Sequence, residues 1–134
     1  MHIMIRAAVT GASGRMGKLI ISNIVAFDGM QLSAAFDLVN IGKDAGETAQ
    51  VGNLGVAISD VKDMEKVLKG SATDVLIDFT IADATVVNAP RAASAGVNLV
   101  IGTTGLSDEQ KHIIDDVIII EKEPSRNTTP PLPS

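Results

Sequence analysis

The 134-residue sequence contains no cysteine, no tryptophan and no tyrosine, and only three phenylalanines. Because cysteine is absent, the chain has neither a disulfide framework nor a thiolate metal site, and its composition is compatible with a reducing compartment. Because aromatic residues are scarce, the hydrophobic content of 46% comes mainly from aliphatic side chains. The length is typical of a single domain, so we expect one aliphatic core.

An excess of positive charge is also missing. The net charge is −5 and acidic residues are interspersed with basic ones, so no segment offers the concentrated positive field that nucleic acid binding requires. No apolar run approaches the roughly 18 residues of a membrane span, and Met1 to Thr10 lacks the order of a signal peptide. We therefore expect a cytoplasmic protein that contacts neither nucleic acid nor membrane.

Proline is rare until the end of the chain. Four of the five prolines fall among serine, asparagine and threonine at Pro124, Pro130, Pro131 and Pro133. Such a segment has little apolar surface to bury. We expect one domain over residues 1–120, followed by a disordered tail over residues 121–134.

Short apolar runs alternate with helical patterns along the domain. The runs predict strands at Ile3–Thr10, Gln31–Phe36, Leu54–Ile58, Asp74–Phe79, Val97–Ile101 and Val117–Ile120. Helices are predicted to begin after Ser13 and over Asp60–Leu68, Ala82–Ala95 and Ser107–Asp116, whereas Leu38–Asn53 is expected to be a loop. This alternation predicts an α/β fold of the Rossmann type, a doubly wound parallel sheet with helices on both faces.

Two details of the helices can be predicted from residue types. In the first helix, Ser13 is the expected N-cap, and the three- and four-residue spacing predicts a buried face of Met16, Leu19, Ile20, Ile24 and Phe27. In the helix over Ala82–Ala95, Pro90 is expected to kink or divide the helix, because proline removes a backbone donor.

The most informative motif is the glycine turn Gly11–Gly17, which reads GASGRMG between a predicted strand and a predicted helix. Glycines let a backbone approach a diphosphate closely, and the first turn of the helix supplies N–H donors. Asp37 ends the next strand, twenty residues past Gly17, where a carboxylate accepts hydrogen bonds from a ribose. The alternative is a tight strand–helix turn with an ordinary surface aspartate.

The residues beside this motif bear on the choice of cofactor. Arg15 is placed to contact the phosphates, or the 2′-phosphate of NADP; the alternative is a solvated arginine. Leu38 follows Asp37 at a position where an NADP enzyme often carries a basic residue. An acid followed by an apolar residue favours NADH over NADPH.

Two further strands end in polar or glycine-rich segments, Asp78–Thr80 and Gly102–Gly105. Ligands of open α/β sheets bind beyond the carboxyl ends of the strands, so both segments are expected to face the glycine turn. The alternative for each is a turn that binds no ligand.

Several of these motifs, in this order, resemble the dihydrodipicolinate reductase family. The matching segments are Val9–Gly17 (VTGASGRMG), Asp44–Glu47 (DAGE), Ile77–Thr80 (IDFT) and Val100–Gly105 (VIGTTG), and the resemblance covers about Ile3 to Asp116. It implies a Rossmann domain that uses NAD(P)H to reduce 4-hydroxy-tetrahydrodipicolinate to tetrahydrodipicolinate in lysine and diaminopimelate biosynthesis.

Carried over residue by residue, the resemblance implies a cofactor site and no metal site. The implied cofactor-binding residues are Gly11, Ala12, Ser13, Gly14, Arg15, Met16, Asp37, Phe79, Thr80, Gly102, Thr103 and Thr104. Of these, Thr104 is also implied to lie near the substrate.

Family members continue into a second, catalytic domain with an Ala-Asn-Phe-Ser hinge, a His-His pair, a lysine and a Ser-Gly-Thr segment, none of which occurs here. His2 and His112 stand alone and are expected at the surface. The first hypothesis is therefore a truncated reductase with a cofactor site but no catalytic residues. The alternatives are a free-standing NAD-binding regulatory module and a half-enzyme that pairs with a separate catalytic domain.

Overall fold

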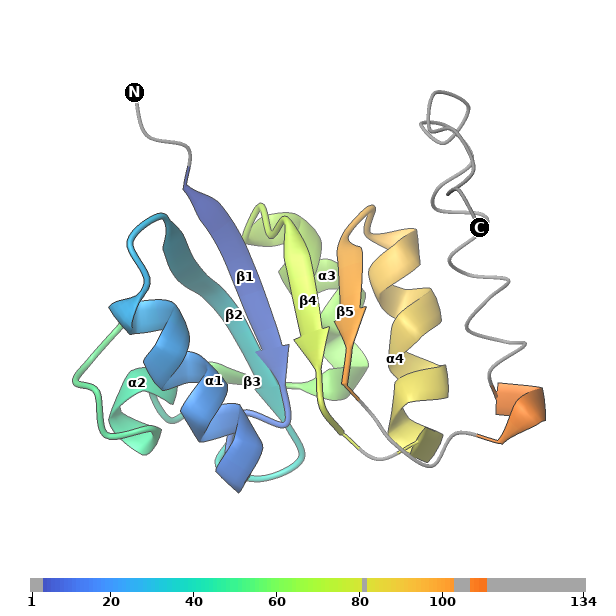
Figure 1. Ribbon diagram of the computed structural model, residues 1–134, viewed down its shortest axis with the longest axis horizontal. Helices are drawn as coiled ribbons and strands as arrows, with labels where there is room; N and C mark the ends of the chain where they lie inside the picture. The colour runs from blue at the N-terminus through green and yellow to red at the C-terminus, as the bar shows by residue number, and fades with distance from the viewer. Residues whose placement is uncertain (1–3, 81, 103–106, 111–134) are drawn as a thin grey trace, which may run out of the picture.

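A computed structural model describes residues 4–80, 82–102 and 107–110, and within them the strands form one parallel sheet (Figure 1). The strands are β1 (Ile5–Thr10), β2 (Met30–Asp37), β3 (Ile58–Asp60), β4 (Val75–Asp78) and β5 (Asn98–Ile101), in the order β3-β2-β1-β4-β5. The chain winds outward from β1 in one direction and then restarts beside it at β4. This reversal between β1 and β4 confirms the predicted doubly wound sheet.

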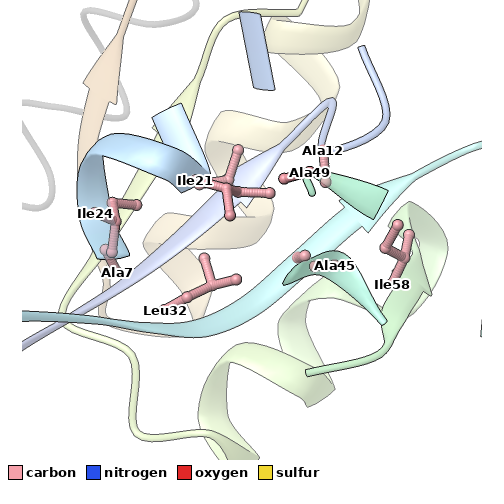
Figure 2. Close-up of a cluster of buried hydrophobic side chains, with 10 residues drawn as sticks. Ala7, Ala12, Ile21, Ile24, Leu32, Ala45, Ala49 and Ile58 are labelled. Carbon is pink, nitrogen blue, oxygen red and sulfur yellow. The ribbon is translucent and has the colours of Figure 1, made fainter. Parts of the chain in front are cut away.

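Helices cover both faces of the sheet (Figure 1). On one face lie α1 (Arg15–Ala26) and α2 (Ala45–Thr48); on the other lie the 3₁₀ helix η1 (Val61–Asp63), α3 (Met64–Gly70) and α4 (Ala82–Ser94). In the first layer, Ile21 and Ile24 of α1 pack against the sheet with Leu32 of β2 (Figure 2). Both clusters are almost entirely aliphatic, as the composition predicts.

The buried face of α1 differs from the predicted one. The structure buries Gly17, Ile21 and Ile24, and Ile20 packs against the same cluster, so the prediction is confirmed for Ile20 and Ile24. Met16, Leu19 and Phe27, which the spacing placed in the core, are 49%, 55% and 59% exposed. Gly17 has to face the chain that leaves β1, because only a residue without a side chain fits there. The aliphatic pattern alone did not reveal this contact.

The segment between β2 and β3 contains regular structure that the sequence did not predict. Asp44 caps α2 by accepting a hydrogen bond from Glu47 N at 3.0 Å. The same carboxylate accepts bonds from Leu54 N and Val56 N, each at 3.0 Å. These two N–H groups are thereby taken by a side chain, so the strand expected over Leu54–Ile58 is wrong, and β3 begins only at Ile58.

The backbone bonds of Asp44 predict a pH-dependent contribution to stability. Burial would raise the pKa of Asp44, but hydrogen bonds from Leu54, Glu47, Val56 and Gly55 N–H outweigh it and lower the pKa below its ordinary value. The stabilisation is therefore present above the unfolded pKa near 4 and is lost as pH falls through the lowered folded pKa. We expect Asp44→Ala to lower the free energy of unfolding at pH 7 by about 1–2 kcal/mol.

This prediction is checked by urea unfolding between pH 7 and pH 3. The variant should lose less stability on acidification than the unsubstituted chain. Asp63→Ala is the matched control, because Asp63 stands at the N-cap of α3 without a side-chain capping bond. An Asp44→Ala variant as stable as Asp63→Ala would contradict the assigned role of Asp44.

The remaining predictions concern the second half of the chain. The helix α4 runs through Pro90 from Ala82 to Ser94, so the expected division of the helix is wrong. Ala89 and Ala92, on either side of Pro90, are fully buried, and we attribute the continuity of the helix to this packing.

No helix of the described part of the chain is long and apolar enough to cross a membrane.

Some predictions lie partly or wholly outside the described residues. The helix expected from Ser107 is described only as far as Gln110. There Ser107 Oγ accepts from Gln110 N at 3.1 Å, and Gln110 Oε1 accepts from Ser107 N at 2.9 Å. This reciprocal pair confirms the expected start of the helix. The strand predicted over Val117–Ile120 and the tail predicted over residues 121–134 lie outside the described residues.

Candidate functional site

An open cleft of about 590 Å³ lies at the carboxyl edge of the sheet, where the strand order reverses. It is bounded by the turn after β1, the ends of β2 and β4, and one side of α4. In open α/β sheets this crevice is the usual ligand site, because the strand ends and helix N-termini converge there.

The three glycines of the turn serve different physical needs. Gly11 has φ +84°, and a Cβ there would lie 3.2 Å from the methyl carbon of Thr80. A Cβ on Gly17 would lie 2.0 Å from the carbonyl oxygen of Gly11, which no backbone tolerates. Gly14 has an ordinary φ of −79°, and its nearest contact would be Gly11 O at 3.4 Å. The fold therefore requires glycine at 11 and 17, whereas at Gly14 the missing side chain leaves the cleft open.

The start of α1 supplies hydrogen-bond donors to this cleft. The N-cap of α1 is Gly14, and among the described residues no side chain caps the helix and no acid lies in its first turn. The predicted N-cap, Ser13, is wrong, because the turn places its hydroxyl 3.4 Å from Val39 O instead. The uncapped N–H groups of the first turn and the Arg15 side chain thus give this wall of the cleft a positive character.

Asp37 lies beside the turn, as its position in the sequence predicts. Its Oδ2 accepts a hydrogen bond from Ser13 N at 2.7 Å, and its Oδ1 accepts one from Leu38 N at 2.6 Å. These bonds fix the carboxylate against the glycine turn at the edge of the cleft. A carboxylate oxygen accepts more than one hydrogen bond, so Asp37 retains the capacity to bind a diol.

Ala12 and Ser13, which were also predicted to bind the cofactor, do not line the cleft. Ala12 is fully buried and packs in the cluster under α1 (Figure 2). Ser13 contributes its backbone N–H to Asp37. Both residues therefore support the turn, whereas Gly11, Gly14 and Met16 line the cleft itself.

The end of β4 forms the opposite wall. Phe79 and Thr80 both line the cleft. The Phe79 ring lies directly on Gly102, since a Cβ on Gly102 would come within 2.1–2.4 Å of three ring carbons. The end of β4 therefore faces the glycine turn as expected, whereas Gly102 at the end of β5 lies against the Phe79 ring and does not itself line the cleft. Thr103 and Thr104 lie outside the described residues.

The lining of the cleft also contains Val61, Asn88 and Arg91, which the sequence did not single out. Leu38 and Val61 form an apolar margin, and Asn88 and Arg91 come from α4. The Arg91 guanidinium is held by a bond from Nη1 to Val61 O at 2.8 Å. No local motif marks these residues, because only the packing of α4 against the η1–α3 segment brings them to the cleft.

The cleft combines a glycine turn, uncapped N–H groups, an anchored carboxylate and an apolar margin. This combination suits an elongated anionic ligand that carries a sugar diol and a flat ring. The described residues contain no group of three or more histidine, cysteine or acidic side chains that could hold a metal ion. His2 and His112 lie outside the described residues.

Comparison with known sequences agrees with this geometry. The family described as dihydrodipicolinate reductase, N-terminus, matches residues 5–122. The 4-hydroxy-tetrahydrodipicolinate reductase of Methanococcoides burtonii is 68% identical over 116 residues, which are 87% of this chain and 44% of that protein. The enzyme of the same name from Methanocaldococcus jannaschii is 49% identical over 118 residues, covering 86% of this chain and 43% of that protein. The chain thus spans less than half the length of these relatives.

Solved structures with the same fold include a dipicolinate-bound dihydrodipicolinate reductase from Paenisporosarcina sp. TG-14. It superposes with a TM-score of 0.71 at 26% identity, over 90% of this chain and 45% of that one. A Rex-family repressor, RSP, solved in complex with β-NADH, superposes with a TM-score of 0.61 at 19% identity, over 92% of this chain and 61% of that one. At this identity the second likeness shows the shared fold alone.

Proposed function

This chain belongs to the dihydrodipicolinate reductase N-terminal family, and on that premise we propose that its cleft binds a nicotinamide dinucleotide. The observation that carries the proposal is the bond from Ser13 N to the Asp37 carboxylate at 2.7 Å. It holds a ribose acceptor beside an uncapped helix N-terminus, so that one dinucleotide reaches both.

Each wall of the cleft has a proposed role. The diphosphate lies over Gly11, Gly14, Arg15 and Met16, where N–H groups and the guanidinium offset its charge. Asp37 accepts hydrogen bonds from the hydroxyls of the adenosine ribose, and Phe79 and Gly102 border the nicotinamide. When bound, the reduced nicotinamide supplies a hydride. The residues of this chain hold and orient the nicotinamide ring. We extend the same site to Thr103 and Thr104, with Thr104 near the substrate.

We propose that the protein family's reaction, the reduction of 4-hydroxy-tetrahydrodipicolinate in lysine and diaminopimelate biosynthesis, uses this segment as its cofactor-binding half. The segment spans 44% of the Methanococcoides burtonii enzyme, and its cleft contains no histidine or lysine among the described residues. Substrate binding and proton donation therefore belong to a second domain, in the same protein or a separate chain. The second candidate function is an NAD-binding module without catalysis, which the same cleft supports.

We propose that NADH binds at least as tightly as NADPH. Leu38 is 74% exposed at the margin of the cleft directly after Asp37, so that a 2′-phosphate beside the ribose would meet a carboxylate and an apolar side chain. Leu38→Arg should strengthen NADPH binding by about tenfold or more, because a hydrogen bond to a charged group contributes about 1.5–3 kcal/mol. The measurement is the quenching or enhancement of reduced nicotinamide fluorescence during titration of the chain.

Val25→Arg is the matched control for this experiment. Val25 is 44% exposed on the last turn of α1, away from the cleft, so the substitution adds the same charge without a phosphate contact. A strong NADPH preference of the unsubstituted chain would overturn the proposed choice of cofactor. An absence of binding to either nucleotide would overturn the proposed function.

A further inference from the structure

Two buried polar side chains meet beneath the cleft at the reversal of strand order. Thr10 ends β1 and Asp78 ends β4, and the two are paired across the parallel ladder. Thr10 is 2% exposed and Asp78 is fully buried. Their side chains point to the same face of the sheet, because Ala8 and Leu76, two residues earlier on each strand, both belong to the cluster under α3 and α4.

One oxygen from each of these side chains has no hydrogen-bond partner within the described part of the chain. These atoms are Thr10 Oγ1 and Asp78 Oδ2. A buried polar atom without a partner carries its full desolvation penalty. A valine would have the same shape as Thr10 without this cost, so the hydroxyl is unfavourable in the arrangement seen here.

The other oxygen of Asp78 is fully engaged. Asp78 Oδ1 accepts bonds from Thr80 N at 2.9 Å and from Thr80 Oγ1 at 2.5 Å. Thr80 in turn is the residue whose methyl group lies against Gly11. Asp78 therefore holds one wall of the cleft, while Thr10, directly before Gly11, holds the other.

A cation site is a poor explanation for the unpartnered oxygen. Thr80 Oγ1 bonds to this carboxylate and Thr85 Oγ1 lies 3.3 Å from Thr80 Oγ1, and no metal-ligating group of three is present among the described residues. Asp78 forms no ion pair with another described residue. Among these residues the ion pair is between Lys69 and Glu65. A hydroxyl donor for Asp78 Oδ2 is nevertheless available on the neighbouring strand, because Thr10 is the residue paired with Asp78.

We propose that Thr10 and Asp78 are a positioning pair for the dinucleotide, in which the Thr10 hydroxyl donates to Asp78 Oδ2 when the dinucleotide is bound. This inference rests on the proposed function. A diphosphate held by the glycine turn draws that turn toward the Phe79–Thr80 wall, and the hydroxyl–carboxylate bond joins the two walls in that arrangement. Binding and bond formation then favour each other. Both unpartnered atoms are satisfied together, by a charge-assisted bond.

The test is Thr10→Val, measured by NADH titration and by thermal unfolding. The dissociation constant for NADH should rise about tenfold, equivalent to about 1.4 kcal/mol. Tm without NADH should stay unchanged or rise, because the variant removes an unpartnered buried hydroxyl. Thr10→Ser, which keeps the hydroxyl, should bind NADH within about twofold of the unsubstituted chain.

Thr73→Val is the matched control. Thr73 is also a buried threonine, but it lies at the opposite edge of the sheet, and its hydroxyl bonds to Ser33 Oγ at 2.7 Å and Ser71 Oγ at 2.8 Å. Removing that hydroxyl should lower Tm and leave NADH affinity unchanged, the reverse of the result expected for Thr10→Val.

The outcomes separate this inference from the proposed function. If the unsubstituted chain does not bind NADH, both are overturned. If it binds NADH and Thr10→Val binds equally well, only the positioning pair is overturned. A Thr10→Val variant that unfolds at lower temperature or fails to fold also overturns it, because the hydroxyl would then stabilise the chain irrespective of the dinucleotide.

Discussion

Gly17→Ala is expected to destabilise the chain severely and to abolish NADH binding. The added Cβ would lie 2.0 Å from Gly11 O, 2.8 Å from Gly11 C and 2.9 Å from Ala12 Cα. These are backbone atoms, so no side chain can move aside, and either α1 shifts away from the sheet or the turn opens. Overpacking of this kind costs about 3 kcal/mol or more, which lowers Tm by roughly 10 °C or more in a domain of this size.

Thermal unfolding followed by circular dichroism measures this effect, with Gly70→Ala as the control. Gly70 is also a glycine within a helix, at the end of α3, and a Cβ there would meet nothing within 4 Å. That substitution should leave Tm unchanged or raise it, since alanine favours the helix by up to about 1 kcal/mol. Equal Tm values for the two variants would contradict the packing assigned to Gly17.

Gly14→Asp is expected to weaken NADH binding about 100-fold while leaving the fold intact. The new carboxylate would stand at the N-cap of α1, a position where aspartate stabilises a helix, so Tm should not fall. The same charge would face the diphosphate at a separation of about 5 Å, which costs about 3 kcal/mol at an effective dielectric constant of 20. Affinity and stability should therefore change in opposite directions.

Gly14→Asn separates charge from size. Asparagine has nearly the same volume and is an equally good N-cap, but it carries no charge. Its loss of NADH affinity should be clearly smaller than that of Gly14→Asp. If Gly14→Asp binds NADH as well as the unsubstituted chain does, the glycine turn is not the diphosphate site.

The order and type of most elements could be predicted from the sequence, because each buried strand is a short apolar run followed by a turn residue. The prediction was wrong where a side chain took over backbone hydrogen bonds. Asp44 caps α2 and holds Leu54 and Val56, and this delays β3 to Ile58. Aspartate in a polar segment is too common for its three backbone contacts to be inferred from the sequence.

The buried face of α1 is a second feature that the sequence predicted only in part. An aliphatic pattern defines a helical stripe only to within one residue when apolar residues occur on both sides of it. Here Gly17 decides the rotation through its contact with Gly11, and Met16 and Leu19 remain exposed. Packing of backbone against backbone outweighed the burial of two larger side chains.

The sequence by itself determined the family, the parallel α/β fold, the glycine turn and the position of Asp37, because these depend on residue types at short spacings along one strand–helix–strand unit. Tertiary structure alone decided that the Asp37 carboxylate is held by Ser13 N, that Asn88 and Arg91 reach the cleft, and that Thr10 meets Asp78 across the sheet. These contacts join segments distant in the chain, and only the strand order and the packing of α4 bring such segments together.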